Sequence, residues 1–129
     1  MPLLPDDADY LAERGIAYEV REEGGMTCVV LPRWTLPAGL STSETDVLIR
    51  LAPGYPDIAP DMWWVDPPLR LADGVEIAAT QVTEQHLGRT WQRWSRHFNA
   101  GHWRPGTDRL SGYLALMDVE FRRAAGAAA

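Results

Sequence analysis

The stretch that decides the fold runs from Tyr55 to Trp64 and reads YPDIAPDMWW. Its prolines predict a turn, because proline fixes one backbone angle and lacks the amide hydrogen that a strand donates. Met62–Val65 then predicts a short strand, which Asp66-Pro67-Pro68 ends. The two adjacent tryptophans of this strand point to opposite faces, so we expect one to be buried and the other to be partly exposed at a partner surface.

Upstream of this stretch the sequence predicts one helix and the rest of a four-stranded antiparallel meander. The short helix has Asp6 as its N-terminal cap and ends at Gly15. A hairpin turn at Glu23-Gly24-Gly25 joins the first two strands, and Pro32 limits regular pairing beyond them. Alternating apolar residues place the three upstream strands at Ile16–Arg21, Met26–Leu31 and Ser43–Leu51.

Downstream, the residues from Leu69 to Trp103 show no clear periodicity, and we expect a long irregular segment that carries function. Thr107 or Asp108 then caps a C-terminal helix that continues to about residue 125. The predicted fold class is therefore α+β, in a single domain over residues 1–129 with its core between about residues 6 and 125. The helix has one apolar stripe that we expect to be buried: Leu110, Tyr113, Leu114, Met117 and Phe121.

The composition narrows the possible function classes. The net charge of −6 argues against non-specific binding of nucleic acid, which needs a basic face. No apolar run approaches the roughly 18 residues that span a membrane, and the N-terminus has no signal-peptide pattern. The single cysteine, Cys28, is expected in the core, and the lack of an internal disulfide fits a reducing cytoplasm.

Two further motifs follow the Tyr-Pro turn. Trp94-Ser95-Arg96-His97 comes first, and Trp103-Arg104-Pro105-Gly106 then leads into the C-terminal helix. This order of turn, reactive position, Trp-x-Pro element and helix resembles the ubiquitin-conjugating (E2, UBC-like) fold over about residues 6–125. The two motifs are similar to those of a bacterial branch, the prokaryotic E2 family E, which is associated with operons for ubiquitin-like conjugation.

The resemblance implies an E2-like carrier or transferase. Such a protein receives a ubiquitin-like protein (Ubl) from an E1-like adenylating enzyme and binds no cofactor or metal of its own. In that family the catalytic cysteine lies about eight residues before the tryptophan of the Trp-x-Pro element, and this position is Ser95 here. The Ubl C-terminus would therefore be held as an oxyester in place of a thioester. The usual His-Pro-Asn signature is absent, and only Gln85 and His86 lie at a comparable distance.

A serine nucleophile needs a base, because its hydroxyl is far less acidic than a thiol, and histidine is the usual choice. His97 is two residues from Ser95 and would share a face with it on an extended segment. His102 and His86 are the other candidates for a catalytic histidine.

Other polar side chains of the same region could assist the reaction. The amides of Gln85 and Asn99 are available as oxyanion donors. Three arginines at helical spacing predict a binding site for an acidic partner surface or for the incoming carboxylate: Arg89, Arg93 and Arg96.

Two other interpretations remain open at this point. The first is an inactive E2 variant that binds a Ubl or an E1-like partner without chemistry. The second is a metal-dependent, hydrolase-like protein that uses the three histidines and Asp108, although their spacings match no standard zinc pattern. All twelve basic residues are arginines. The absence of lysine fits either base-composition bias or an enzyme that avoids modifying itself. The three downstream tryptophans are expected in the core: Trp91, Trp94 and Trp103.

Overall fold

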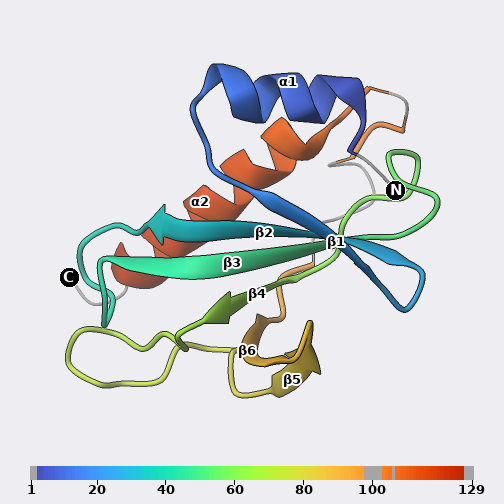
Figure 1. The fold of residues 1–129 in the computed structure, drawn as a ribbon. Coiled ribbons are helices and arrows are strands. Elements are labelled where there is room, and N and C mark those ends of the chain that lie inside the picture. Colours follow the sequence, from blue (N-terminus) through green and yellow to red (C-terminus); the bar gives the residue numbers. More distant parts are fainter. Residues whose placement is uncertain (1–2, 98–102, 106, 127–129) are drawn as a thin grey trace.

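The fold is described by a computed structural model that covers residues 3–97, 103–105 and 107–126 (Figure 1). This part of the chain contains one antiparallel sheet with the strand order β1-β2-β3-β4-β6-β5 and two helices. The α+β class and the C-terminal helix are as predicted. The elements are α1 (Pro5–Glu13), β1 (Glu19–Glu23), β2 (Met26–Thr35), β3 (Glu44–Leu51), β4 (Trp63–Asp66), β5 (Thr83–His86), β6 (Arg89–Trp94) and α2 (Leu110–Gly126).

Both helices pack on one face of the sheet and form the main core with it (Figure 1). Leu11 of α1 and Trp63 of β4 belong to the same buried cluster as the apolar stripe of α2. All five residues of the predicted stripe are buried, which confirms that the 3.6-residue periodicity marks the core side of this helix.

The sheet has six strands, so the predicted four-stranded sheet was too small. The two additional strands, β5 and β6, lie within the Leu69–Trp103 segment, which was predicted to be irregular. β5 escapes detection because Thr83–His86 is an edge strand of polar residues without apolar alternation. β1 also begins later than expected, at Glu19, and β2 continues past Pro32 to Thr35.

Pro32 does not end β2 because the strand contains a bulge between Leu31 and Trp34. Arg33, inside the bulge, has a φ of 51° and donates its backbone N–H to the Asp46 carboxylate at 2.9 Å. A side chain of β3 thus replaces the ladder bond that the bulge removes.

The β5–β6 hairpin covers the second face of the sheet. Trp91 of β6 packs there in a separate buried cluster with Cys28, Leu48 and Trp64. Trp63 and Trp64 do point to opposite faces, but both are buried, so the expectation of one partly exposed tryptophan was wrong. The same cluster accounts for Cys28, which is buried as predicted.

Asp7 connects the two helices and the Tyr-Pro turn. Its buried carboxylate accepts a hydrogen bond from the Leu110 N–H at 3.0 Å, at the start of α2, and one from the Tyr55 hydroxyl at 2.6 Å. Asp7 therefore caps α2 from outside the helix. Among the described contacts, the Asp108 carboxylate accepts from the Arg104 N–H, outside α2, in place of the predicted local cap. Asp6 is not a cap either, because α1 begins at Pro5.

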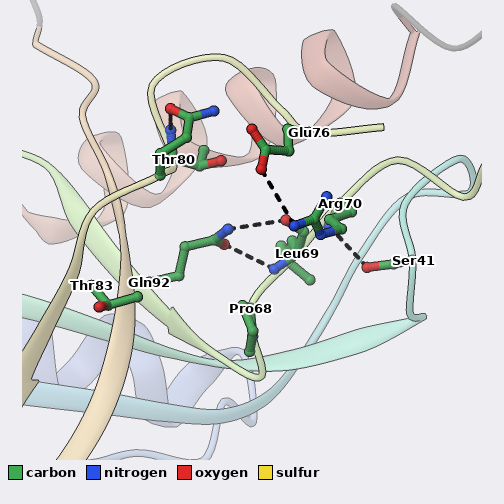
Figure 2. Close-up of a pocket in the computed structure, with 9 residues that line it drawn as sticks. Ser41, Pro68, Leu69, Arg70, Glu76, Thr80, Thr83 and Gln92 are labelled. Carbon is green, nitrogen blue, oxygen red and sulfur yellow. Dashed lines mark hydrogen bonds and ion pairs between the residues drawn. The ribbon is translucent and has the colours of Figure 1, made fainter. Parts of the chain in front are cut away.

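On the helix side of β6, Gln92 attaches the segment after β4 to the sheet (Figure 2). Its side-chain amide accepts from the Leu69 N–H at 2.8 Å and donates to the Leu69 carbonyl at 3.0 Å, as a neighbouring strand would. The Trp94 indole donates to the same Gln92 oxygen at 3.0 Å. Gln92 therefore helps to fix the orientation of the end of β6, where Ser95 follows.

Replacing Asp7 should destabilise the whole fold. Asp7→Ala leaves the Tyr55 hydroxyl and the Leu110 N–H without their buried acceptor. We expect a loss of about 2–4 kcal/mol in the free energy of unfolding, measured by urea denaturation. Asp9→Ala, on the exposed side of the same helix, is the matched control and should change this free energy by less than about 0.5 kcal/mol. Equal effects of the two substitutions would contradict the capping role.

Candidate functional site

Ser95 is the first residue after β6, and its backbone is firmly held. Its N–H donates to the Ala79 carbonyl at 3.0 Å, and the next N–H, of Arg96, donates to the Trp94 carbonyl at 2.9 Å. The second bond closes a tight turn centred on Ser95. The Ser95 hydroxyl oxygen accepts a hydrogen bond from Arg93 Nε at 3.1 Å and is only partly exposed.

His97 pairs with a carboxylate that the sequence analysis did not select. His97 Nδ1 lies 2.7 Å from Asp61 Oδ1, and both side chains are well exposed, at 63% and 60%. The pairing of Trp63 with Trp94 brings them together, because the antiparallel register continued past the strand ends places Asp61 beside the residues after β6. A carboxylate at Nδ1 holds that proton and leaves Nε2 as the basic nitrogen.

The extended geometry that would place His97 beside Ser95 is interrupted by the turn at Ser95. In the described residues the hydroxyl is hydrogen-bonded to Arg93 and the imidazole to Asp61, not to each other. His97 is nevertheless only two residues from Ser95, at the exposed end of the strand.

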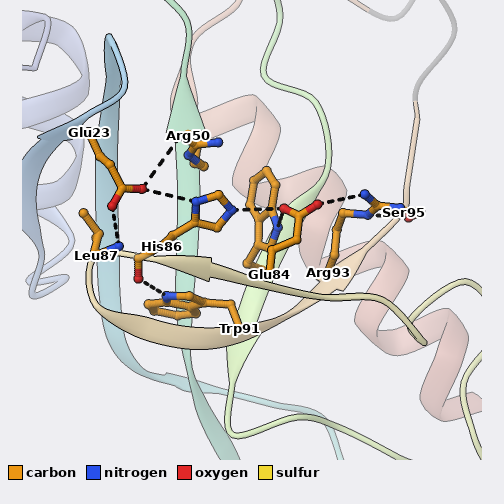
Figure 3. A network of polar contacts seen from close by, with 9 residues as sticks. Glu23, Arg50, Glu84, His86, Leu87, Trp91, Arg93 and Ser95 are labelled. Carbon is orange, nitrogen blue, oxygen red and sulfur yellow. Dashed lines mark hydrogen bonds and ion pairs between the residues drawn. The ribbon is translucent and has the colours of Figure 1, made fainter.

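His86 occupies a different position, at the end of β5. Its Nδ1 lies 3.2 Å from Glu23 Oε1 and its Nε2 lies 3.0 Å from Glu84 Oε1, while its ring packs edge-on against Trp64. The side chain is only 11% exposed. The predicted catalytic histidine is therefore joined to Ser95 only indirectly, through Glu84 and Arg93 (Figure 3).

Each of the three predicted anion-binding arginines is paired with a carboxylate of this chain. Arg89 and Arg93 lie on strand β6, so their spacing is not helical, and Arg96 follows the strand. Arg96 is half-buried beside Glu120 at 3.2 Å, and burial lowers the pKa of its guanidinium although Glu120 acts in the opposite direction. The other contacts are those of Arg89 with Asp46 at 2.9 Å and Asp66 at 2.8 Å, and of Arg93 with Glu84 at 2.9 Å.

The Tyr-Pro turn and the Trp-x-Pro element, which are far apart in sequence, lie side by side in the structure. The Trp103 indole donates to the Pro56 carbonyl at 2.8 Å, and its ring lies 6.2 Å from that of Tyr55. Trp103 is partly buried against the main core, whereas Trp91 and Trp94 are fully buried, as expected.

The remaining predicted groups contribute less to this geometry. Gln85 donates to the Thr90 hydroxyl across the β5–β6 hairpin. His102 and Asn99 lie outside the described residues. Within the described ranges, no group of three or more histidine, cysteine or acidic side chains is arranged to hold a metal ion.

Glu84 is the centre of the polar contacts around Ser95. Burial alone would raise the pKa of this carboxyl, but hydrogen bonds with His86, Trp64 and Arg93 outweigh burial and hold the pKa below its ordinary value. At the far end of the same network, the backbone N–H of Leu87 is the main cause that lowers the pKa of Glu23. Both carboxylates are therefore charged at neutral pH.

The fold and the site together define an α+β protein with a serine, a histidine and a carboxylate gathered at one end of an antiparallel sheet. The family model of prokaryotic E2 family E matches residues 3–124. The chain belongs to this family, which implies in general an interaction with a ubiquitin-like protein and an E1-like enzyme. No curated protein and no solved structure matches the chain at a significant level. Neither described helix has the length and apolar character needed to cross a membrane.

The lowered pKa of Glu84 predicts a pH-dependent effect of its removal. A carboxylate whose pKa falls on folding adds stability above its unfolded pKa, about 4.5, and this stability is lost as the pH falls through the folded value. Glu84→Gln should therefore lower the free energy of unfolding near pH 7, and the difference from the native chain should shrink towards about pH 3. Urea unfolding of both chains at several pH values between about 3 and 7 measures this difference.

Glu44→Gln, at an exposed position of β3, is the matched control for loss of one carboxylate. Its effect on the free energy of unfolding should be small, because the side chain is exposed. A Glu84→Gln deficit that stays constant from neutral to acid pH would show that the charge of Glu84 does not stabilise the fold.

Proposed function

We propose that this chain is an E2-like carrier that holds the C-terminus of a Ubl on Ser95 as an oxyester. Family membership supports the general role, and the position of Ser95 before the Trp-x-Pro element supports the choice of residue. The observation that carries the proposal is the 2.7 Å pair of Asp61 and His97, two residues from the hydroxyl. It supplies an oriented imidazole two residues along the chain from a serine, and nucleophilic acyl transfer requires such a base.

In the proposed step, His97 Nε2 removes the proton of the Ser95 hydroxyl as the oxygen attacks the activated Ubl carboxyl carbon. The new Oγ–C bond forms, and the bond from that carbon to the activating group on the E1-like enzyme breaks. The proton held by His97 then leaves with the activating group. Hydroxyl and imidazole must leave their present partners and rotate towards each other, and such catalytic bonds commonly tighten only when substrate binds.

The subsequent transfer to an amine needs more assistance than a thioester requires, because an oxyester is the less reactive acyl donor. The same imidazole, now neutral, can accept a proton from the attacking amine. The Asp61 carboxylate would stabilise the imidazolium that forms in each step.

A non-catalytic binding module is the second candidate, and one observation favours it. Ser95 accepts its described hydrogen bond from Arg93, while His97 is bound to Asp61 and His86 to two glutamates. A chain that holds a Ubl or an E1-like partner without forming a bond would need no closer approach of serine and histidine.

Reconstitution separates the two candidates. The chain is mixed with its E1-like enzyme, the Ubl and ATP, and a denaturing gel is run with and without mild alkali or thiol. We expect an alkali-labile, thiol-resistant adduct that is lost in Ser95→Ala. His97→Ala should reduce the rate of adduct formation about 10²–10⁴-fold, because it removes the base.

Ser43→Ala, in the connection before β3, is the control for loss of a hydroxyl elsewhere and should form the adduct normally. Ser95→Cys should give a thiol-sensitive adduct, because the thioester is open to exchange. An undiminished adduct in Ser95→Ala would exclude this residue as the acceptor. Binding of the Ubl without any adduct in the native chain would favour the binding module.

A further inference from the structure

A continuous chain of polar contacts crosses the second face of the sheet, the one opposite the helices, and ends at the Ser95 hydroxyl (Figure 3). This face is called the outer face. Arg93 Nε donates to Ser95 Oγ at 3.1 Å, and Arg93 NH1 donates to Glu84 Oε2 at 2.9 Å. The other carboxylate oxygen of Glu84, Oε1, accepts a hydrogen bond from the Trp64 indole at 2.8 Å and lies 3.0 Å from His86 Nε2. The guanidinium therefore contacts the hydroxyl with one nitrogen while a carboxylate holds another.

The alternation of β6 explains why this arrangement forms. Residues 91 and 93 point to the outer face, and Ser95 continues the same side before the chain turns. Arg93 is paired with Trp64 of β4, while its N–H donates to the Val82 carbonyl at 2.8 Å. Both the backbone and the charged end of Arg93 are thus fixed.

Glu84 is itself held from the opposite edge of the sheet. His86 contacts Glu23 with its second nitrogen, and Glu23 also accepts from the Leu87 N–H at 2.7 Å. This contact joins the β1–β2 hairpin to the β5–β6 hairpin, two tips that lie at opposite ends of the strand order. Both ring nitrogens of His86 thus face carboxylate oxygens.

We propose that Arg93 is a catalytic residue that orients the Ser95 hydroxyl and stabilises its developing negative charge, and that Glu84 is the positioning residue for Arg93. A hydroxyl that accepts from a guanidinium still has its own proton to donate, so Arg93 and a base can act on it together. His86 then belongs to the support of Glu84, not to the reacting groups. The inference rests on the proposed acceptor role of Ser95.

A cysteine at position 95 makes this environment measurable without any partner protein. In Ser95→Cys, the rate of alkylation by iodoacetamide against pH reports the pKa of the new thiol, because only the thiolate reacts. Cys28, the native thiol, is fully buried, so the native chain is the control and should remain unlabelled. We expect a midpoint below the ordinary value of about 8.5 for a free cysteine.

Adding Arg93→Gln to Ser95→Cys should raise the midpoint by about 0.5–1 pH unit, since it removes the donor and its charge. Arg122→Gln, on the exposed side of α2, removes the same charge elsewhere and should leave the midpoint unchanged. Thermal unfolding confirms that each variant is folded. If Arg93→Gln does not fold, Arg93→Lys keeps a cation but lacks the Nε donor, and it should raise the midpoint by a smaller amount.

Glu84→Ala, added to Ser95→Cys, tests whether Glu84 acts by holding Arg93 in place or only through its own negative charge near the thiol. Loss of a nearby negative charge alone would favour the thiolate and lower the midpoint. Loss of the group that holds Arg93 in place would raise it, and this rise is the expected result. A lowered midpoint with Glu84→Ala, or an unchanged one with Arg93→Gln, would overturn the assignment.

A failure of the Arg93 proposal can be told apart from a failure of the proposed function, because the alkylation experiment needs neither the Ubl nor the E1-like enzyme. In the serine form, Arg93→Gln should slow adduct formation at least about tenfold at saturating Ubl. In the cysteine form, measured at a pH above the thiol midpoint of both variants, the same change should slow it much less, because the thiol is then already ionised. Equal losses in both forms would indicate a structural role and contradict the proposal.

Discussion

The antiparallel pairing of β4 with β6 is the constraint on which the candidate site depends. Trp63 lies opposite Trp94, and the two rings stack 5.9 Å apart in the main core. This register sends Arg93 to the outer face and Gln92 to the helix side, and it brings Asp61 to the residues after β6. Because side-chain direction alternates with each residue, a slip by one position would exchange the two faces and dismantle the site and the core together.

The outer face of the sheet is stabilised without a covering helix. In a small apolar cluster around Trp64 and Trp91, the guanidinium groups of arginines lie over the two indole rings. The Arg89 guanidinium lies 4.3 Å from the Trp91 ring centre while its nitrogens bind Asp46 and Asp66. Pairing and stacking together offset the cost of partly desolvating these charges, which isolated surface ion pairs do not achieve. The polar network that reaches Ser95 is therefore also part of the packing.

The sequence predicted those features that depend on local periodicity or on a motif. The buried stripe of α2 follows from its helical spacing, and the Gly24-Gly25 turn follows from the backbone freedom of glycine. The features it missed depend on contacts between distant residues. β5 is a strand because β6 pairs with it, and Trp64 is buried because that hairpin covers it. Asp61 had no local signal, since its relation to His97 arises 36 residues away through sheet pairing.

The surroundings of Ser95 suggest how a serine can occupy a position where the family pattern has a cysteine. A thiol ionises with little help, whereas a hydroxyl needs both a base and a donor to its oxygen. In the proposed mechanism the donor would come from β6 through Arg93, which bonds the Ser95 hydroxyl, and the base would be His97, which Asp61 holds. With arginine as the only basic side chain besides histidine, the chain also presents no lysine amine that could attack the proposed oxyester.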